Sequence, residues 1–439
     1  MSAYLITSDG RPLRAIEQKI QKYLPGLDAR LIPLSESRAI IRAHLLEALA
    51  IEYTTPREQW LKVLGIESLQ PLTDEQALGT LQGRDTSSLP KLRATATPKV
   101  NKLDWHLDAV NVQAAWQLLG GPDSIAWGDT KVAHLDTGYT LHPALGFPGN
   151  TWVDTAGAQT DIPPQPNGGT HFQPPEIGHG RDHLQGFSGG HGTRIGATIC
   201  GWAPQASGGR YYGVAPKVPY LPMRITDSVW INHAQRQFAS ALDHVTTIGQ
   251  ASVVNVSLGL FASTVLPELR HALDSAYDAG VIVVCAAGNY VDPVVAPARL
   301  NRTVAVAGVT AELRPWSGSS FGLEVDFSAP GADLRRADVN RKFDFSYSGG
   351  GDGTSYATAI TSAAAALWLT HRRQELLAAY SEKWCIVEAF VRLARQTASV
   401  PPGISWKADA GFGAGILDIG ALLAAPLPPQ SQLKRAPNS

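Results

Sequence analysis

The sequence contains few cysteines, and their spacing argues against both a disulfide framework and a zinc site. Only three of the 439 residues are cysteine, namely Cys200, Cys285 and Cys385. An odd number of cysteines without any C-x-x-C pair is typical of free thiols in a core rather than of metal ligands or stapled loops. We therefore expect three buried free thiols.

Long apolar segments are also missing. The N-terminus is interrupted by Asp9, Arg11 and Arg14, so it lacks the apolar core of about 7–15 residues that a secretory signal needs. The longest apolar run elsewhere, 359–369, is far shorter than the ~20 residues that span a bilayer. These two absences predict a cytoplasmic protein without a membrane partner.

Net charge is nearly absent as well. The 37 basic and 38 acidic residues leave a formal charge of −1, which gives no electrostatic basis for binding nucleic acid or an anionic membrane. Hydrophobic residues make up 44% of the chain and charged residues 17%, a balance that indicates a globular protein with a sizeable core.

The chain separates into regions of different pattern. Residues 1–85 suggest a small α+β domain, with strands at 3–7, 29–33 and 39–43 and helices at 14–23 and 56–64. Residues 86–100 are mostly polar, contain prolines and have no periodicity, which is typical of a linker. Residues 426–439 read as a disordered tail.

Residues 101–425 alternate between expected strands and expected helices. Apolar runs at 131–135, 252–256, 281–286 and 304–309 predict strands that are buried on both faces. Between them, 232–248 and 266–279 have helical periodicity, and each is followed by a glycine. This order predicts an α/β fold in which a parallel β-sheet carries helices on both faces.

Residues suited to chemistry follow three of these strands. Functional groups in such sheets gather beyond the carboxyl ends of the strands, so these residues should meet at one edge. They are Asp136, then Ser257, Leu258 and Gly259, and then Ala287, Gly288 and Asn289.

Two further segments place a histidine and a serine at the expected starts of helices. His191 lies in GGHGT and Ser355 in GDGTS, and small or apolar residues follow both. A serine hydroxyl becomes a good nucleophile when a histidine removes its proton and a buried carboxylate such as Asp136 orients that histidine. The amide of Asn289 could stabilise the resulting oxyanion, or it could instead order its own turn.

These segments resemble the signatures of the subtilisin-like serine proteases, or subtilases, in that family's order of Asp, His and Ser. The matching stretches are VAHLDTG at 132–138, HGT at 191–193, AAGN at 286–289 and GTSYAT at 353–358. The resemblance covers about 101–425. The chain departs from the usual family pattern at Arg194, Tyr356 and Ala359, none of which is a triad position.

The resemblance implies a serine endopeptidase that hydrolyses a polypeptide substrate through an acyl-enzyme. It implies that Asp136, His191 and Ser355 are catalytic, that Asn289 belongs to the oxyanion hole, and that Ser257, Leu258, Gly259, Ala287 and Gly288 bind substrate. No cofactor is required by such an enzyme, and no catalytic metal is expected. Relatives often bind structural calcium, for which Asp154, Asp161, Asp292 and Asp352 are available.

The role of residues 1–85 is open at this point. In the order of their elements they resemble the propeptide of the family, which would make the chain a zymogen. A permanent regulatory or docking domain is the alternative. The sequence does not identify a regulatory partner.

Other serines and histidines of the sequence offer alternative sites, and the fold allows alternative functions. Ser188 and Ser320 each lie in a G-x-S-x-G pattern, but neither has the preceding strand and following helix that a nucleophile elbow needs. His179 and His183 are four residues apart, yet the surrounding glycines and prolines favour a loop over a metal-binding helix. A non-catalytic binding module, or an esterase or peptide ligase using the same triad, would also fit the fold.

The proposed base generates a first prediction. Because a histidine base loses its function when it is protonated, activity should fall as the pH drops through about 6–7. The measurement is a pH profile of peptide hydrolysis. A profile that stays flat down to about pH 4 would contradict His191 as the base.

Overall fold

The computed structural model describes residues 3–8, 16, 30–33, 38–42, 66–72, 103–160, 180–184, 188–229, 231–232, 234–260, 265–291, 293–404, 406 and 411–439. The chain divides into a smaller unit, formed mainly by 1–99, and a larger unit that contains most of 100–439. Each unit is described by itself.

The smaller unit contains an antiparallel sheet with the strand order β2-β3-β1-β4. Its strands are β1 (Ala3–Ser8), β2 (Arg30–Pro33), β3 (Arg38–Arg42) and β4 (Ile66–Leu72). The three expected strands are therefore present, while β4 was missed because it contains Pro71. A proline is tolerated there because β4 is an edge strand. The helices expected at 14–23, apart from the helical Ile16, and at 56–64 lie outside the described residues, as does the linker at 86–100.

The larger unit is built on a seven-stranded sheet whose neighbouring strands all run parallel, in the order β13-β12-β11-β10-β5-β9-β6. This confirms the predicted α/β fold with a parallel sheet. The strands are β5 (Val132–Asp136), β6 (Gln159–Thr160), β9 (Tyr220–Arg224), β10 (Val253–Val256), β11 (Ile282–Ala286), β12 (Val304–Val309) and β13 (Phe327–Pro330).

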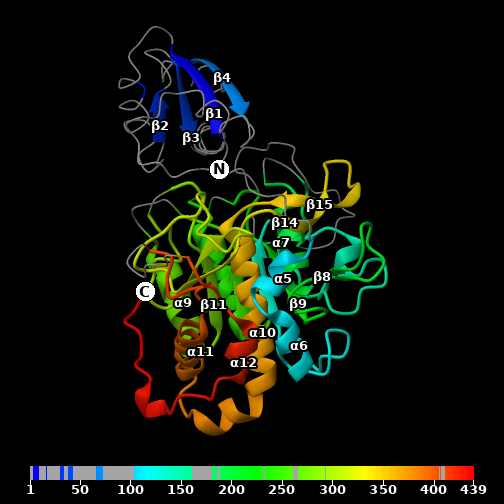
Figure 1. Cartoon of the computed structure of the whole chain (residues 1–439), viewed down its shortest axis with the longest axis vertical. Coiled ribbons are helices and arrows are strands. Elements are labelled where there is room, and N and C mark those ends of the chain that lie inside the picture. Colours follow the sequence, from blue (N-terminus) through cyan, green and yellow to red (C-terminus); the bar gives the residue numbers. More distant parts are fainter. Residues whose placement is uncertain are drawn as a thin grey trace. The chain divides into compact units, whose positions relative to one another are not determined.

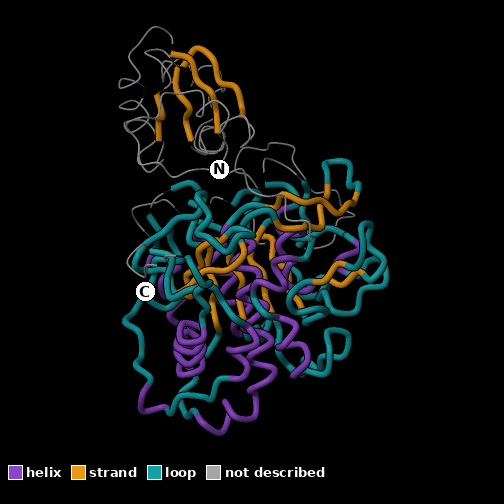
Figure 2. Tube along the Cα trace, viewed as in Figure 1, coloured by secondary structure: helices purple, strands orange, loops and turns teal. Residues whose placement is uncertain are grey.

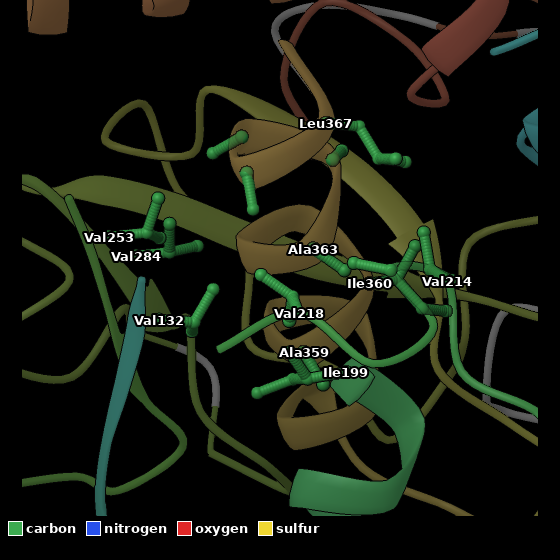
Figure 3. Close-up of a cluster of buried hydrophobic side chains, with 14 of the residues drawn as sticks. Val132, Ile199, Val214, Val218, Val253, Val284, Ala359, Ile360, Ala363 and Leu367 are labelled. Carbon is green, nitrogen blue, oxygen red and sulfur yellow. The ribbon is translucent and has the colours of Figure 1, made fainter. Parts of the chain in front are cut away.

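Alternate residues along the central strands belong to two separate hydrophobic clusters, one on each face of the sheet. Val132, Val253 and Val284 point to the face covered by α7 and α10, where they share a cluster with Ile199 and Ile360 (Figure 3). Their chain neighbours, such as Ala133, Val254 and Val283, point to the other face and pack with α8 and α9. Burial on both faces explains why these strands are continuously apolar instead of alternating with polar residues.

Helices of the larger unit surround this sheet (Figure 2). Their bounds are α5 (Trp105–Ala109), α6 (Val112–Leu118), α7 (His191–Cys200), α8 (Gln235–Thr247), α9 (Pro267–Asp278), α10 (Thr354–Ala379), α11 (Trp384–Thr397) and α12 (Ile419–Ala424), with short 3₁₀ turns η1 (Pro143–Leu145) and η3 (Gln430–Gln432). Two small antiparallel pairs complete the unit, β7 (Trp202–Ala203) with β8 (Tyr211–Tyr212) and β14 (Leu334–Val339) with β15 (Phe345–Gly351).

The central helix is α10, which carries the predicted serine at its start. Every residue from 354 to 369 is buried, and this stretch is rich in alanine, serine and threonine. Small side chains let the helix axis approach the sheet closely, and the helix runs through the larger unit in Figure 1. An all-round apolar pattern correctly predicted this central position.

In the larger unit one strand was missed and one expectation was wrong. The strand β9 was not anticipated because Pro222 interrupts its pattern, yet it pairs with β5 along its whole length. Residues 426–439, expected to be disordered, lie along the surface because their carbonyl groups accept hydrogen bonds from the body of the unit. The pairs are Tyr380 to Pro428, Arg392 to Gln432 and Arg302 to Ala436.

The remaining expectations concern thiols and membrane spans. Cys200, Cys285 and Cys385 are buried and free, as predicted. Among the described residues, no helix combines the length and the apolar character that crossing a bilayer would require.

Buried histidines make the stability of this unit depend on pH. Burial lowers the pKa of His142 from 6.5 to about 4, and its Nδ1 accepts a hydrogen bond from the backbone of Ala144 at 2.9 Å. Because the unfolded chain binds this proton more readily, stability present above pH 6.5 should decline as the pH falls from 6.5 to 4. The decline should reach up to about 3 kcal/mol. In His142→Asn, which keeps an acceptor for Ala144, the decline should be smaller.

Denaturant unfolding at several pH values measures this effect. A matched control is Asn150→Ala, which removes hydrogen bonds to the backbone of Trp152 and Val153 without removing a titrating group. Its loss of stability should be the same at every pH. An unchanged pH slope in His142→Asn would contradict the prediction.

Candidate active site

Three of the predicted site residues meet at the carboxyl edge of the parallel sheet. Asp136 is the last residue of β5, His191 is the first residue of α7, and Ser355 is the second residue of α10. Residues 55 and 164 positions apart in sequence are thus brought into hydrogen-bond contact. A strand end and two helix starts hold these side chains, so their backbones are fixed by regular structure.

The side chains of Asp136, His191 and Ser355 are linked in series by hydrogen-bond contacts that lead from the interior toward the surface. His191 Nδ1 lies 2.8 Å from Oδ1 of Asp136, and His191 Nε2 lies 3.2 Å from the Ser355 hydroxyl. The Asp136 side chain is 1% exposed, whereas that of His191 is 13% exposed. The carboxylate is therefore buried while the imidazole can be reached from solvent.

Asp136 remains ionised although it is buried. Burial by itself would raise the pKa of Asp136, but the positive charge and hydrogen bonds available from His191 and His134 outweigh it and hold the pKa far below its usual value. The backbone N–H of Thr137 adds a further hydrogen bond to Oδ1 at 2.7 Å. The site thus holds a fixed negative charge behind His191.

A second buried acid, Asp182, positions the start of α7. Its Oδ2 accepts hydrogen bonds from the Thr137 hydroxyl at 2.6 Å and from the backbone of Gly190 at 2.8 Å. Thr137 Oγ1 in turn accepts from the backbone of Gly192 at 3.0 Å. A Cβ at Gly192 would lie 2.0 Å from the carbonyl oxygen of Gly138, so only glycine allows this approach of the two segments.

Ser355 also contacts Ser257, one of the residues expected to bind substrate. The Ser355 hydroxyl lies 3.3 Å from the carbonyl oxygen of Ser257, and the Ser257 hydroxyl donates to the carbonyl of Ser355 at 3.0 Å. This reciprocal pair joins the end of β10 to the first turn of α10. It places the nucleophile candidate next to the segment 257–259.

The Asn289 side chain meets the start of α10. Its Oδ1 accepts hydrogen bonds from the backbone N–H of Thr354 at 2.8 Å and from the Thr354 hydroxyl at 2.9 Å. Because both bonds require an acceptor, the oxygen is turned toward the helix and the Nδ2 group is left to face elsewhere. A Cβ at Gly353 would lie 3.5 Å from that Nδ2 and 3.7 Å from Cβ of Ser355. The amide nitrogen and the Ser355 side chain therefore both lie beside Gly353.

The other expected substrate-binding residues are largely engaged within the protein. The side chains of Leu258 and Ala287 belong to the hydrophobic cluster on the α8 and α9 face. The backbone N–H of Gly259 donates to Val229, and its carbonyl accepts from Ile231. The carbonyl of Gly288 accepts from Ser320. Sequence position alone does not reveal this internal use of the backbone.

The sequence reasoning missed two residues beside Asp136. His134 Nε2 lies 3.1 Å from Asp136 Oδ2, and His134 Nδ1 lies 2.6 Å from the hydroxyl of Tyr220. The signal available in the sequence was a histidine inside the apolar strand segment VAHLD. Tyr220 offered no comparable signal because its strand was not recognised.

The alternative nucleophiles are occupied. The Ser320 hydroxyl donates to the carbonyl of Val291 at 2.7 Å, and Ser188 Oγ accepts from the backbone of Val229 at 3.1 Å. Neither side chain has a histidine contact among those described. Both hydroxyls are thus engaged in hydrogen bonds to the backbone.

Two of the candidate calcium ligands, Asp154 and Asp352, are engaged within the protein. Among the described residues, no group of three or more His, Cys, Asp or Glu side chains is placed to hold a metal ion. Asp154 accepts from the backbone of Gly157 at 2.7 Å and lies 3.8 Å from Lys131, and Asp352 accepts from the backbone of Asp333 at 2.7 Å. Asp161 and Asp292 lie outside the described residues.

The geometry joins a hydroxyl, an imidazole and an ionised buried carboxylate in series. Such a series can transfer a proton from the hydroxyl to the imidazole while the carboxylate stabilises the charge that forms. The N-terminal turn of α10 supplies backbone N–H groups without intrahelical partners next to the hydroxyl. The arrangement is suited to nucleophilic acyl transfer.

The comparisons with known proteins agree on one family. The model of the subtilase family matches residues 128–410. The Major intracellular serine protease of Bacillus subtilis is 28% identical over 305 residues, covering 68% of this chain and 83% of that protein. Subtilisin E of the same organism is 31% identical over 255 residues, covering 55% of this chain and 56% of its own length.

A solved structure supports the fold. The crystal structure of MycP1 with the N-terminal propeptide removed aligns with a TM-score of 0.53 at 22% identity, covering 74% of this chain and 98% of that one. At this level of identity the match concerns the architecture of the chain only.

Proposed function

This chain belongs to the subtilase family of serine endopeptidases, and we propose that it hydrolyses peptide bonds through Ser355, His191 and Asp136. The observation that carries the proposal is the continuous chain of contacts, 2.8 Å and 3.2 Å long, that ends on the Ser355 hydroxyl. The polypeptide substrate is proposed from the names of the relatives, which are proteases.

In the proposed mechanism, Ser355 Oγ attacks the substrate carbonyl carbon as His191 Nε2 takes its proton. Asp136 holds His191 by its Nδ1–H and stabilises the imidazolium. Collapse of the tetrahedral intermediate forms the acyl-enzyme, and His191 donates its proton to the leaving amine. Water then repeats the attack and releases the acid.

We assign stabilisation of the oxyanion to Asn289 Nδ2 and to the backbone N–H groups at the start of α10. The acceptor half of the Asn289 amide is bound to Thr354, which leaves its donor half for the developing charge. The two interpretations of Asn289 thus combine, because one end of the amide orders the helix start and the other end serves the oxyanion. Ser257 would lie beside the bound substrate because it contacts Ser355 directly.

An esterase or peptide ligase would use the same acyl-enzyme, and only the acceptor would differ. Removal of residues 1–85, a cytoplasmic location and structural calcium remain predictions from the sequence. The presence of an ionised Asp136 next to an accessible His191 favours an active enzyme over a binding module.

The test of this function is reaction with a fluorophosphonate probe, which labels activated serines. We expect the wild-type protein to be labelled and Ser355→Ala to remain unlabelled, because the probe bonds only to the activated hydroxyl. Peptide hydrolysis should be lost in parallel.

Ser320→Ala is the matched control, since it removes a serine that lies in a G-x-S-x-G pattern and whose hydroxyl donates to the carbonyl of Val291. It should keep its labelling. If the intact chain is not labelled, the reaction is repeated after limited proteolysis within 86–100, and labelling that appears only then indicates a zymogen. If neither the intact nor the cleaved protein is labelled, the catalytic assignment is overturned in favour of a binding module.

A second prediction separates the two ends of the Asn289 amide. Asn289→Asp keeps the acceptor for Thr354 but loses the donor, so it should fold normally and lower kcat by about 10²–10³ with little change in KM, a magnitude measured in subtilisin itself. Thr354→Val, which keeps the backbone bond to Oδ1 but loses the hydroxyl bonds to Asn289 and Gly288, should have a much smaller effect. Full activity in Asn289→Asp would mean that Asn289 acts only on the helix start.

A further inference from the structure

His134 lies in the middle of β5, two residues before Asp136, and is 1% exposed. Side chains two apart on a strand project to the same face, so His134 and Asp136 both face α7. The positions before and after His134 are alanine and leucine, and both are fully buried. A polar ring at this depth is stable only when its nitrogens are hydrogen-bonded.

Both nitrogens of the His134 ring have partners in the fold. Nε2 faces Oδ2 of Asp136 at 3.1 Å, and Nδ1 faces the hydroxyl of Tyr220 at 2.6 Å. Tyr220 is fully buried on the neighbouring strand β9. An ionised carboxylate can only accept, so Nε2 of His134 carries the hydrogen of that bond. In the tautomer with its hydrogen on Nε2, Nδ1 accepts from the tyrosine hydroxyl.

The fold leaves space for this hydroxyl at one position of α7. A Cβ at Gly196 would lie 2.3 Å from the Tyr220 hydroxyl oxygen. Glycine therefore allows the tyrosine ring to reach between the helix and the sheet. The Tyr220 hydroxyl, the His134 imidazole and the Asp136 carboxylate form a buried row. This row ends on Oδ2 of Asp136, whereas His191 bonds to Oδ1.

Asp136 consequently has an imidazole on each oxygen. His191 bonds to Oδ1 and leads to Ser355, while His134 bonds to Oδ2 and leads into the interior. The two bonds together prevent the carboxylate from rotating. A carboxylate held in this way presents one defined oxygen to His191.

We infer that His134 is a positioning residue for the triad, and that Tyr220 holds it in the tautomer that donates to Asp136. The inference rests on the proposed function of Asp136, His191 and Ser355. The negative charge of Asp136, held in place by these two bonds, remains available to the imidazolium that forms on His191 during the reaction.

Other titratable groups lie close to this row of side chains. Asp136 interacts with His191 at the start of α7 and with Asp182 in the loop 180–184, and Tyr220 of β9 interacts with Cys200 at the end of α7. Burial raises the pKa of Cys200 and holds that of Tyr220 well above its usual value, so both keep their protons. From α10, Ser362 contributes a neutral hydroxyl that is bonded to Asn255 on β10.

The decisive comparison is His134→Leu with His134→Gln. Leucine fills the space and removes the donor, whereas the glutamine amide can still donate to Oδ2. We expect His134→Leu to lower kcat by about 10–100-fold with KM nearly unchanged. In this variant the acid limb of the pH profile of kcat/KM should move to higher pH. The reason is that Asp136 then has no second donor, so its negative charge favours the protonated form of the His191 base more strongly. His134→Gln should recover most of kcat and return the limb toward the wild-type position.

Tyr220→Phe tests the tautomer and keeps the inference falsifiable if His134→Leu does not fold. It should lower kcat less than His134→Leu and should add nothing when combined with His134→Gln, which has no tautomer to hold. Tyr277→Phe is the matched control, because it removes an equally buried hydroxyl that bonds to Glu388 instead. That control should not move the pH profile.

Each outcome gives a clear answer. Equal losses in His134→Leu and His134→Gln with an unmoved acid limb would show a packing role only, and wild-type kinetics in both would show no role; either result overturns the inference. Ser355→Ala is assayed alongside. If it stays active, the proposed function fails together with this inference, whereas an inactive Ser355→Ala leaves the His134 variants to decide.

Discussion

A buried negative charge on Asp136 is the constraint around which the larger unit is organised. An ionised carboxylate that is removed from water is stable only when hydrogen bonds and opposite charge replace its hydration. The middle of β5, the turn that follows it and the start of α7 supply these groups. The precise docking of α7 against the sheet is therefore also the condition for keeping this charge.

Close approach of backbone segments makes that docking possible. The start of α7 touches the turn after β5, and a side chain at Gly192 would collide with the carbonyl of Gly138. Asp182 connects the same two segments through Thr137 and Gly190. Glycines and one buried acid thus replace bulk packing at the place where His191 must be held with a tolerance of a few tenths of an ångström.

The serine is positioned by a different device. The helix α10 is buried from residue 354 to 369, so its place is set by apolar packing against the sheet (Figure 3). Its first turn is then adjusted by Asn289 and Ser257, which bond to Thr354 and Ser355. A rigid central helix with a polar clamp at its start holds a side chain more precisely than a loop could.

Local patterns determined much of this protein. Continuous apolar strands and glycine-closed helices predicted the parallel sheet, and the positions of Asp136, His191 and Ser355 at strand and helix ends predicted their meeting, because parallel strands share one carboxyl edge. Tertiary structure alone decided the rest. The strand β9 carries a proline and became a strand by pairing with β5. The pairing of His134 with Tyr220, and the hydrogen bonds that order 426–439, join residues far apart in the sequence. Such contacts depend on distances in space, which no spacing along the chain records.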